Sequence, residues 1–275
     1  MKHLNIFFPE WQGYGEDNTV QIGAQALKNH LSQLDFAEIQ VPSEEELPVA
    51  NQIMGYNANI RHLRAAVDLL KKEAPASTFM VGGTCASEIA PVSYLNHKYK
   101  GDLGVLWFDA HGDLNSPDSS ASKHFHGMPL RSLLGHGERS VVDAMFSQLS
   151  SSQVFVLGGR DFDQPEIDFI EETDITHLSP QQLSDVDATV EAIKVKGFKN
   201  LYVHVDLDVL EPADFPHMLL PVANGIMVDQ LIALIAALKQ HFNIVGSSIV
   251  EFVPKEEGGL AALDKIVALL PTRSF

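Results

Sequence analysis

The chain has 275 residues, 45% of them hydrophobic, which suits one large α/β domain or two small ones. Its 19 Lys and Arg residues stand against 36 Asp and Glu residues, and the formal charge of −17 disfavours nucleic acid or an anionic membrane as a partner. Cys85 is the only cysteine, which excludes a disulfide framework and a thiolate metal cluster. The longest apolar run, 231–238, is too short to span a membrane, and no signal-peptide core opens the chain, so we expect a cytoplasmic protein.

Apolar runs typical of strands alternate with helical patterns along the whole chain. The predicted strands are 4–8, 38–41, 77–83, 103–110, 153–159, 200–209 and 243–252, with a weaker eighth at 175–179. The predicted helices are 19–34, 55–73, 88–99, 129–135, 164–172, 180–196, 227–240 and 259–270. Continuous apolar strands separated by helices indicate a parallel sheet that is covered on both faces. Because no linker or repeat divides the chain, we predict one α/β domain over residues 1–275, three-layered (α/β/α), with a mainly parallel sheet of about eight strands.

Acidic side chains follow two of the predicted strands. In "LWFDAHGD", Asp109, His111 and Asp113 alternate, so a continuing pleat would point all three the same way. In "HVDLDV", Asp206 and Asp208 repeat this spacing. A single acidic residue at a strand end often only caps a turn. Two such motifs at the ligand-binding edge of one parallel sheet predict a divalent-metal site, because clustered carboxylates resist burial without cations. This oxygen-rich donor set suits manganese.

Two further strand ends and two long loops point to the same edge. "VLGGRDFD" places Asp161 and Asp163 after one strand, and "SIVEFVP" places Glu251 among apolar residues at the end of another. Long connections cover 111–128 and 209–226, and loops of this length in a compact domain are usually functional. A lone glutamate at a strand end is usually a cap or an ion-pair partner, but beside a metal site it could bind a cationic group.

These motifs resemble those of the ureohydrolases, the family of arginase, agmatinase and formimidoylglutamase. The resemblance lies in "DAHGD" with "FHGMPL" and in "DLD" with "EFVP", spans residues 81–254, and is closest to arginase. It implies one α/β domain that binds two manganese ions and a bridging hydroxide, which attacks the carbon of a guanidinium or amidine. It also implies a homo-oligomer.

The resemblance also assigns metal ligands. Asp109 and Asp206 match the carboxylates that bridge the two ions. His111 and Asp208 match ligands of one ion, and Asp113 matches a ligand of the other.

Catalytic and substrate-binding positions follow from the same motifs. His126 matches a histidine that shuttles protons, Glu251 matches the group that grips the substrate guanidinium, and Asp113 could accept a proton from the hydroxide. Asn115 and Ser122 match positions that arginase uses for the α-carboxylate of its substrate. Asp163 and Glu166 match positions that face the α-amino group.

The chain departs from the family where the remaining metal ligand belongs. The family has a "GGDHS"-like stretch, whereas this chain has "VGGTCASE", which puts Cys85 in place of the histidine. A thiolate would select a softer metal than manganese, so we predict a two-ion site with one ion weak or replaced. Glu88 could substitute as a ligand, and Leu220 makes the pocket more apolar where arginases carry a hydroxyl.

These residues favour a metal-dependent hydrolase of a linear C–N bond in a guanidino or formimino amino acid, with arginine the first substrate to test. One alternative is a formimidoylglutamase-type hydrolase. Another is a metal-impaired, non-catalytic paralogue, because Cys85 replaces a ligand. A cysteine nucleophile is disfavoured, since neighbouring carboxylates oppose the thiolate.

Overall fold

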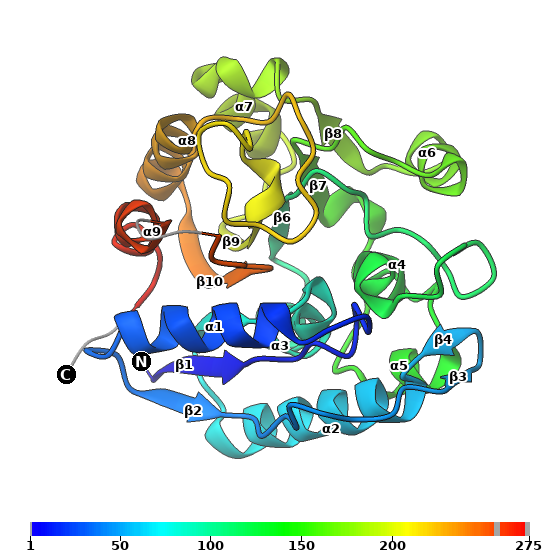
Figure 1. Ribbon diagram of the computed structural model, residues 1–275. Helices are drawn as coiled ribbons and strands as arrows, with labels where there is room; N and C mark the ends of the chain where they lie inside the picture. The colour runs from blue at the N-terminus through cyan, green and yellow to red at the C-terminus, as the bar shows by residue number, and fades with distance from the viewer. Residues whose placement is uncertain (1, 256–258, 273–275) are drawn as a thin grey trace.

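Eight strands pair in parallel to form the central sheet of the computed structural model, which describes residues 2–255 and 259–272 (Figure 1). In spatial order they are β2 (Phe36–Glu38), β1 (His3–Phe8), β5 (Ser77–Gly82), β10 (Asn243–Val250), β9 (Asn200–Asp206), β6 (Gly104–Phe108), β7 (Val154–Leu157) and β8 (Thr176–Leu178). The central strands are apolar throughout because both of their faces are buried. In β6, for example, Trp107 packs into one core while Leu106 and Phe108 pack into the other.

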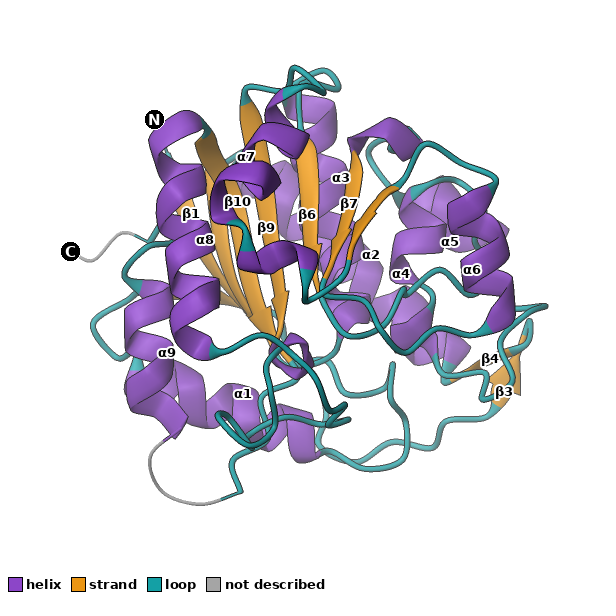
Figure 2. Ribbon diagram, turned by 90° about the horizontal axis from the view of Figure 1, so that it is seen from above, coloured by secondary structure: helices purple, strands orange, loops and turns teal. Residues whose placement is uncertain are grey.

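Helices cover both faces of the sheet, which confirms the predicted α/β/α layers (Figure 2). One face packs against α2 (Tyr56–Glu73), α3 (Ile89–Lys98), α4 (Pro129–Leu133), α5 (Arg139–Ala144) and α6 (Gln164–Glu171). The other packs against α1 (Thr19–His30), α7 (Val186–Lys194), α8 (Val228–His241) and α9 (Gly259–Val267).

Several element boundaries differ from the prediction. The second strand covers 36–38 instead of 38–41, and the helix predicted from 180 begins only at Val186. It begins there because the Asp185 side chain caps it by accepting a hydrogen bond from the amide of Ala188 (3.0 Å). Helix α5 and the hairpin of β3 (Val49–Ala50) with β4 (Ile53–Met54) were not predicted, being too short to show a periodic pattern.

The strand order brings four distant segments to one place. The chain builds β1, β2 and β5, moves on to β6, β7 and β8, and later inserts β9 and β10 between β5 and β6. The carboxyl ends of β5, β10, β9 and β6 therefore lie side by side at the centre of one edge, where the loops gather (Figure 2). In open parallel sheets, ligands bind outside the carboxyl ends of the strands, at the point where the strand order reverses.

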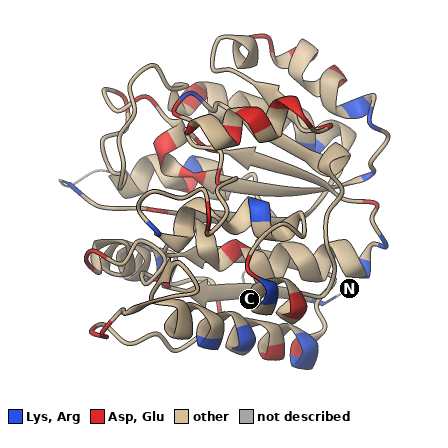
Figure 3. Cartoon of the chain, turned by 90° about the vertical axis from the view of Figure 1, so that its right-hand side faces the viewer, with Lys and Arg blue, Asp and Glu red and all other residues tan. Residues whose placement is uncertain are grey.

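Charged residues of both signs are spread over the outer helices and loops (Figure 3). Most of the 36 acidic residues lie at the surface, and a minority of them is buried around the strand ends described below. Among the described helices, none has both the length and the hydrophobicity that a membrane span requires.

A buried histidine in α2 gives the fold a testable pH dependence. His62 is 2% exposed, and burial, reinforced by the charge of Arg61, lowers its pKa to about 4. Between pH 6.5 and 4, His62 is therefore largely protonated in the unfolded chain but largely neutral in the folded chain. The free energy of unfolding consequently falls as the pH falls through this range. We expect His62 to make the free energy of unfolding about 1–2 kcal/mol lower at pH 5 than at pH 7.

Urea unfolding of the wild type and of His62→Gln at both pH values measures this contribution. The carboxylates at the strand ends titrate in both proteins, so the difference between the two pH dependences isolates His62. Identical pH dependences would contradict the prediction.

Candidate metal centre and active site

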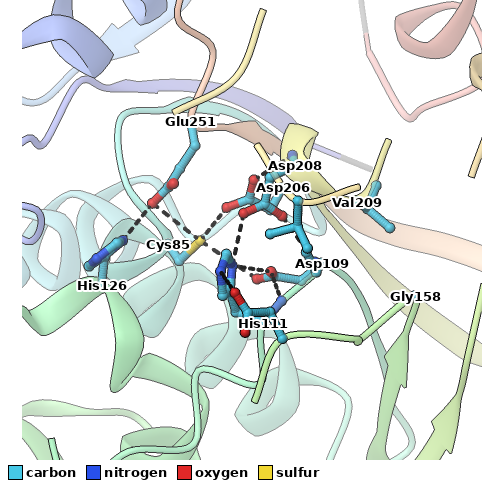
Figure 4. A network of polar contacts seen from close by, with 12 residues as sticks. Cys85, Asp109, His111, His126, Gly158, Asp206, Asp208, Val209 and Glu251 are labelled. Carbon is cyan, nitrogen blue, oxygen red and sulfur yellow. Dashed lines mark hydrogen bonds and ion pairs between the residues drawn. The ribbon is translucent and has the colours of Figure 1, made fainter. Parts of the chain in front are cut away.

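The first group of candidate ligands joins the ends of β6 and β9. Nδ1 of His111 lies 2.9 Å from Oδ2 of Asp208 and 3.5 Å from Oδ1 of Asp109, and all three residues could hold one ion (Figure 4). The other oxygen of Asp208 accepts a hydrogen bond from the amide of Ala110 (2.9 Å), which ties the two strand ends together.

The predicted reason for this convergence was wrong. Asp109 and His111 do meet in this group, whereas Asp113 lines the cavity but belongs to none of the groups of described residues that could hold a metal. Strand β6 ends at Phe108, so Asp109 to Asp113 do not share the alternation of a pleat. Instead the chain turns sharply: the amide of His111 bonds back to Oδ1 of Asp109 (2.6 Å), and Asp113 has a left-handed backbone (φ 54°). Turns, rather than a continued strand, aim these side chains at the cavity.

A second group joins β5, β6 and β9. The Cys85 thiol donates a hydrogen bond to Oδ2 of Asp206 (2.9 Å), and donor atoms of Cys85, Asp109, His204 and Asp206 all lie within 4.8 Å of one another. These four residues are called the Cys85 cluster below. Asp206, Asp208 and Glu251 form a third group of the same kind.

Several of the buried carboxylates repel one another, whereas contacts with His111 and His204 lower the pKa of Asp109 in spite of its burial. Burial and the charge of Asp208 raise the pKa of Asp206 well above its ordinary value, and burial and Asp109 do the same for Asp113. Burial and Asp206 likewise raise the pKa of the Cys85 thiol. The buried Oδ2 of Asp113 has no hydrogen-bond partner among the described residues. Such a site is unfavourable without cations, so the donor set fits a divalent metal.

His126 and Glu251 both line the cavity and contact each other. Nδ1 of His126 lies 2.9 Å from Oε1 of Glu251 (Figure 4). Burial acts to lower the pKa of His126, but the charge of Glu251 raises it above its ordinary value. Glu251 adopts a left-handed backbone (φ 58°) fixed by a hydrogen bond from its amide to the carbonyl of Gly83 (2.8 Å). The backbone of Glu251 is therefore fixed at the end of β10, and its carboxylate lies close to those of Asp206 and Asp208.

The predicted substrate-binding residues lie at the rim of the same cavity, of about 190 Å³. Asn115 donates a hydrogen bond to Oδ2 of Asp163 (2.8 Å), and Ser122 also lines the cavity. Both oxygens of Glu166 accept backbone hydrogen bonds, from Leu114 and from Asp163 (2.9 Å each). Leu220 lines the cavity as well, as predicted.

Sequence reasoning missed His204 and misplaced Glu88. Glu88 accepts a hydrogen bond from the hydroxyl of Tyr202 (2.7 Å) and contacts His204, and it belongs to none of the groups that could hold a metal. His204 stands two residues before Asp206 in β9 and thus on the same face of the strand. That spacing was the available signal.

Comparison with known proteins gives one family. A model of the arginase family matches residues 14–265. An arginase from Staphylococcus aureus (strain MSSA476) is 27% identical over 278 aligned residues, covering 92% of this chain and 90% of that protein. The crystal structure of Entamoeba histolytica arginase in complex with L-ornithine has a TM-score of 0.87 at 24% identity and covers 98% of each chain. Formimidoylglutamase from Bacillus subtilis has a TM-score of 0.75 at 16% identity, covering 98% of this chain and 86% of that one. These two likenesses show the fold. The match of the family model over residues 14–265 shows that the chain belongs to the arginase family of hydrolases.

Proposed function

We propose that this protein is a metal-dependent hydrolase that cleaves a linear C–N bond in a guanidino amino acid, with arginine the first substrate to test. The observation that carries the proposal is the charge of the cavity. Carboxylates line it from its metal groups to its rim, and none of its described lining residues is Lys or Arg. A cavity of this kind selects a cation, and a guanidinium is a planar cation suited to paired carboxylate oxygens.

Metal ligands are available for two neighbouring ions. Asp109, His111 and Asp208 would hold one, and Asp109 also belongs to the Cys85 cluster, which would hold the other. Asp206 lies in the Cys85 cluster and forms a further group with Asp208 and Glu251, which supports the proposal that it bridges the two ions. A divalent pair supplies a nucleophile at neutral pH by lowering the pKa of water. Manganese at the His111 group is our proposal for the metal there, since carboxylate and imidazole donors suit it.

The chain's own residues then bind the substrate and move protons. The carboxylate of Glu251 would receive the guanidinium and orient its carbon toward the metal groups. Glu251 favours the protonated form of His126, which supports the proposal that this imidazolium protonates the departing amine.

The rim is suited to the amino-acid end of the substrate. We propose that Asn115 and Ser122 bind the α-carboxylate and that Asp163 faces the α-ammonium group. Glu166 acts indirectly, because its oxygens are occupied by backbone amides that fix Asp163 and the loop before Asn115. Formiminoglutamate carries a second carboxylate, which would meet Asp161 and Asp163 without a facing Lys or Arg among the described lining residues. The guanidino substrate is therefore favoured over the formimino one.

Turnover of three substrates tests the proposal. Protein loaded with manganese, with zinc and with both metals together is assayed for urea release from arginine and from agmatine and for formamide release from formiminoglutamate. We expect the highest kcat/KM with arginine. Failure to hydrolyse any of the three under all three loadings would contradict the proposal and favour the non-catalytic alternative.

Asn115→Ala is expected to discriminate between two of these substrates. Loss of a hydrogen bond to a charged group should raise KM for arginine about 10- to 100-fold, whereas agmatine, which lacks the carboxylate, should be affected much less. Asn29→Ala, at an exposed amide in α1, is the matched control. An equal loss with both substrates would mean that Asn115 only supports Asp163.

A further inference from the structure

The Cys85 cluster contains an imidazole that compensates for the replaced histidine. Nε2 of His204 lies 3.8 Å from Sγ of Cys85 and 3.7 Å from Oδ2 of Asp109. His204 comes from β9, whereas the family's histidine ligand comes from the position of Cys85 after β5. The cluster therefore offers one thiol, one imidazole and two carboxylates, a donor set different from the one that the family resemblance implies.

His204 is held as metal-bound histidines usually are. Its Nδ1 lies 3.1 Å from Oε1 of Glu88, and its ring stacks on Trp107 with centroids 3.7 Å apart. The other oxygen of Glu88 is bonded to Tyr202, and His204, Glu88 and Tyr202 are all completely buried. Neither Nδ1 of His204 nor Oε1 of Glu88 has an aligned hydrogen-bond partner among the described residues, so this contact is an ion pair. A carboxylate this close to one ring nitrogen favours the proton there, which leaves the lone pair of the other nitrogen for a metal. Here that other nitrogen, Nε2, faces Cys85 and Asp109.

We propose that Cys85, Asp109, His204 and Asp206 bind one zinc-class ion, beside a harder ion held by Asp109, His111 and Asp208. Thiolate and imidazole donors favour zinc over manganese, and four donors of these types suit its tetrahedral coordination. The thiol proton leaves to solvent when the ion binds. Glu88 is a positioning residue that orients His204. This inference rests on the proposed function for the presence of ions in the cavity.

Cobalt is the probe, because Co²⁺ takes the place of zinc and absorbs in the near ultraviolet when a thiolate binds it. Metal-free full-length protein is titrated with Co²⁺ and, in separate experiments, with Zn²⁺ and Mn²⁺. We expect the thiolate absorption in the wild type, tighter binding of zinc than of manganese, and loss of the band in Cys85→Ser. A wild type without the band overturns the inference, and this measurement does not depend on any variant folding.

Three variants test the roles of the individual residues. His204→Gln should weaken zinc binding by more than the roughly 10- to 100-fold expected for Glu88→Gln, which removes only the partner of the ring. Cys85→His should strengthen manganese binding. His62→Gln, a change at another buried histidine, should leave the cobalt spectrum unaltered. Unchanged zinc affinity in His204→Gln would show that His204 only pairs with Glu88 and would overturn the inference, as would unchanged manganese affinity in Cys85→His.

The inference and the proposed function can fail separately. Protein that shows the cobalt–thiolate band but hydrolyses no amidine contradicts the proposed function and supports the Cys85 cluster. The opposite result is protein that hydrolyses arginine with manganese but shows no thiolate band and binds no zinc at the Cys85 cluster. That result supports the proposed function and contradicts the inference about the Cys85 cluster.

Discussion

Replacing Asp206 by asparagine is expected to lower kcat/KM for arginine about 10³-fold or more and, in the same protein, to stabilise the metal-free fold. Asp206 belongs to two of the groups that could hold a metal, so its loss removes a shared ligand whose contribution amounts to several kcal/mol. The effect on stability has the opposite sign because Asp206 is buried beside Asp208, Glu251 and Asp109.

The sign follows from the raised pKa of Asp206. The unfolded carboxyl loses its proton near the ordinary value of 3.8, whereas the folded one keeps it to much higher pH, so this group destabilises the fold increasingly above that value. Asparagine carries no charge and can still accept the hydrogen bond from the amide of Asp208 at Oδ1. We therefore expect the metal-free variant to be about 1–3 kcal/mol more stable than the wild type at neutral pH.

Thermal unfolding with and without metal measures both effects. Saturating metal should stabilise the wild type by about 3 kcal/mol at 100 times its dissociation constant, and the variant far less. Asp68→Asn, an exposed change in α2, is the control and should alter neither quantity. A metal-free Asp206→Asn protein that is less stable than the wild type would show that the carboxylate has a structural role and would contradict the prediction.

The position of the site could be predicted from the sequence because parallel strands end at a common edge. Asp109 and Asp206 each follow an apolar run, and that pattern alone indicates ligands at the carboxyl edge of a sheet. The order of the strands could not be predicted in the same way. It depends on β9 and β10 inserting between β5 and β6, and this order puts Cys85 2.9 Å from Asp206, 121 residues away.

His204 shows what a linear pattern leaves undetermined. A histidine inside an apolar strand is most simply explained as a buried polar residue with a partner, and nothing within the strand identifies that partner. Its role follows from Glu88 on one side and Cys85 on the other, which come from a different part of the chain. Burial and partner identity are properties of the packed structure, so the spacing from His204 to Asp206 can only suggest such a ligand, and its folded neighbours are needed to identify it.

Gly23→Ala is expected to destabilise the protein, because the steric clash that it creates costs more than the gain in helix propensity. Gly23 lies within α1, where alanine is favoured over glycine by about 1 kcal/mol. A Cβ atom at this position, however, would lie 1.6 Å from the carbonyl oxygen of Phe252 and 2.6 Å from its carbonyl carbon. Backbone atoms cannot rotate away as a side chain can, so α1 or the chain after β10 must shift.

That shift should cost more than the gain in helix propensity. Overpacking of this severity costs about 3 kcal/mol or more, which leaves a net loss of about 2 kcal/mol and a Tm lower by roughly 4–8 °C. Because Phe252 follows Glu251 directly, kcat/KM should also fall at temperatures where the variant is fully folded. Gln25→Ala, at an exposed position of the same helix, introduces an alanine without the clash and should not lower the Tm. If Gly23→Ala raised the Tm as well, the close contact between α1 and the segment that carries Glu251 would be refuted, and with it the rigid placement on which the proposed role of Glu251 depends.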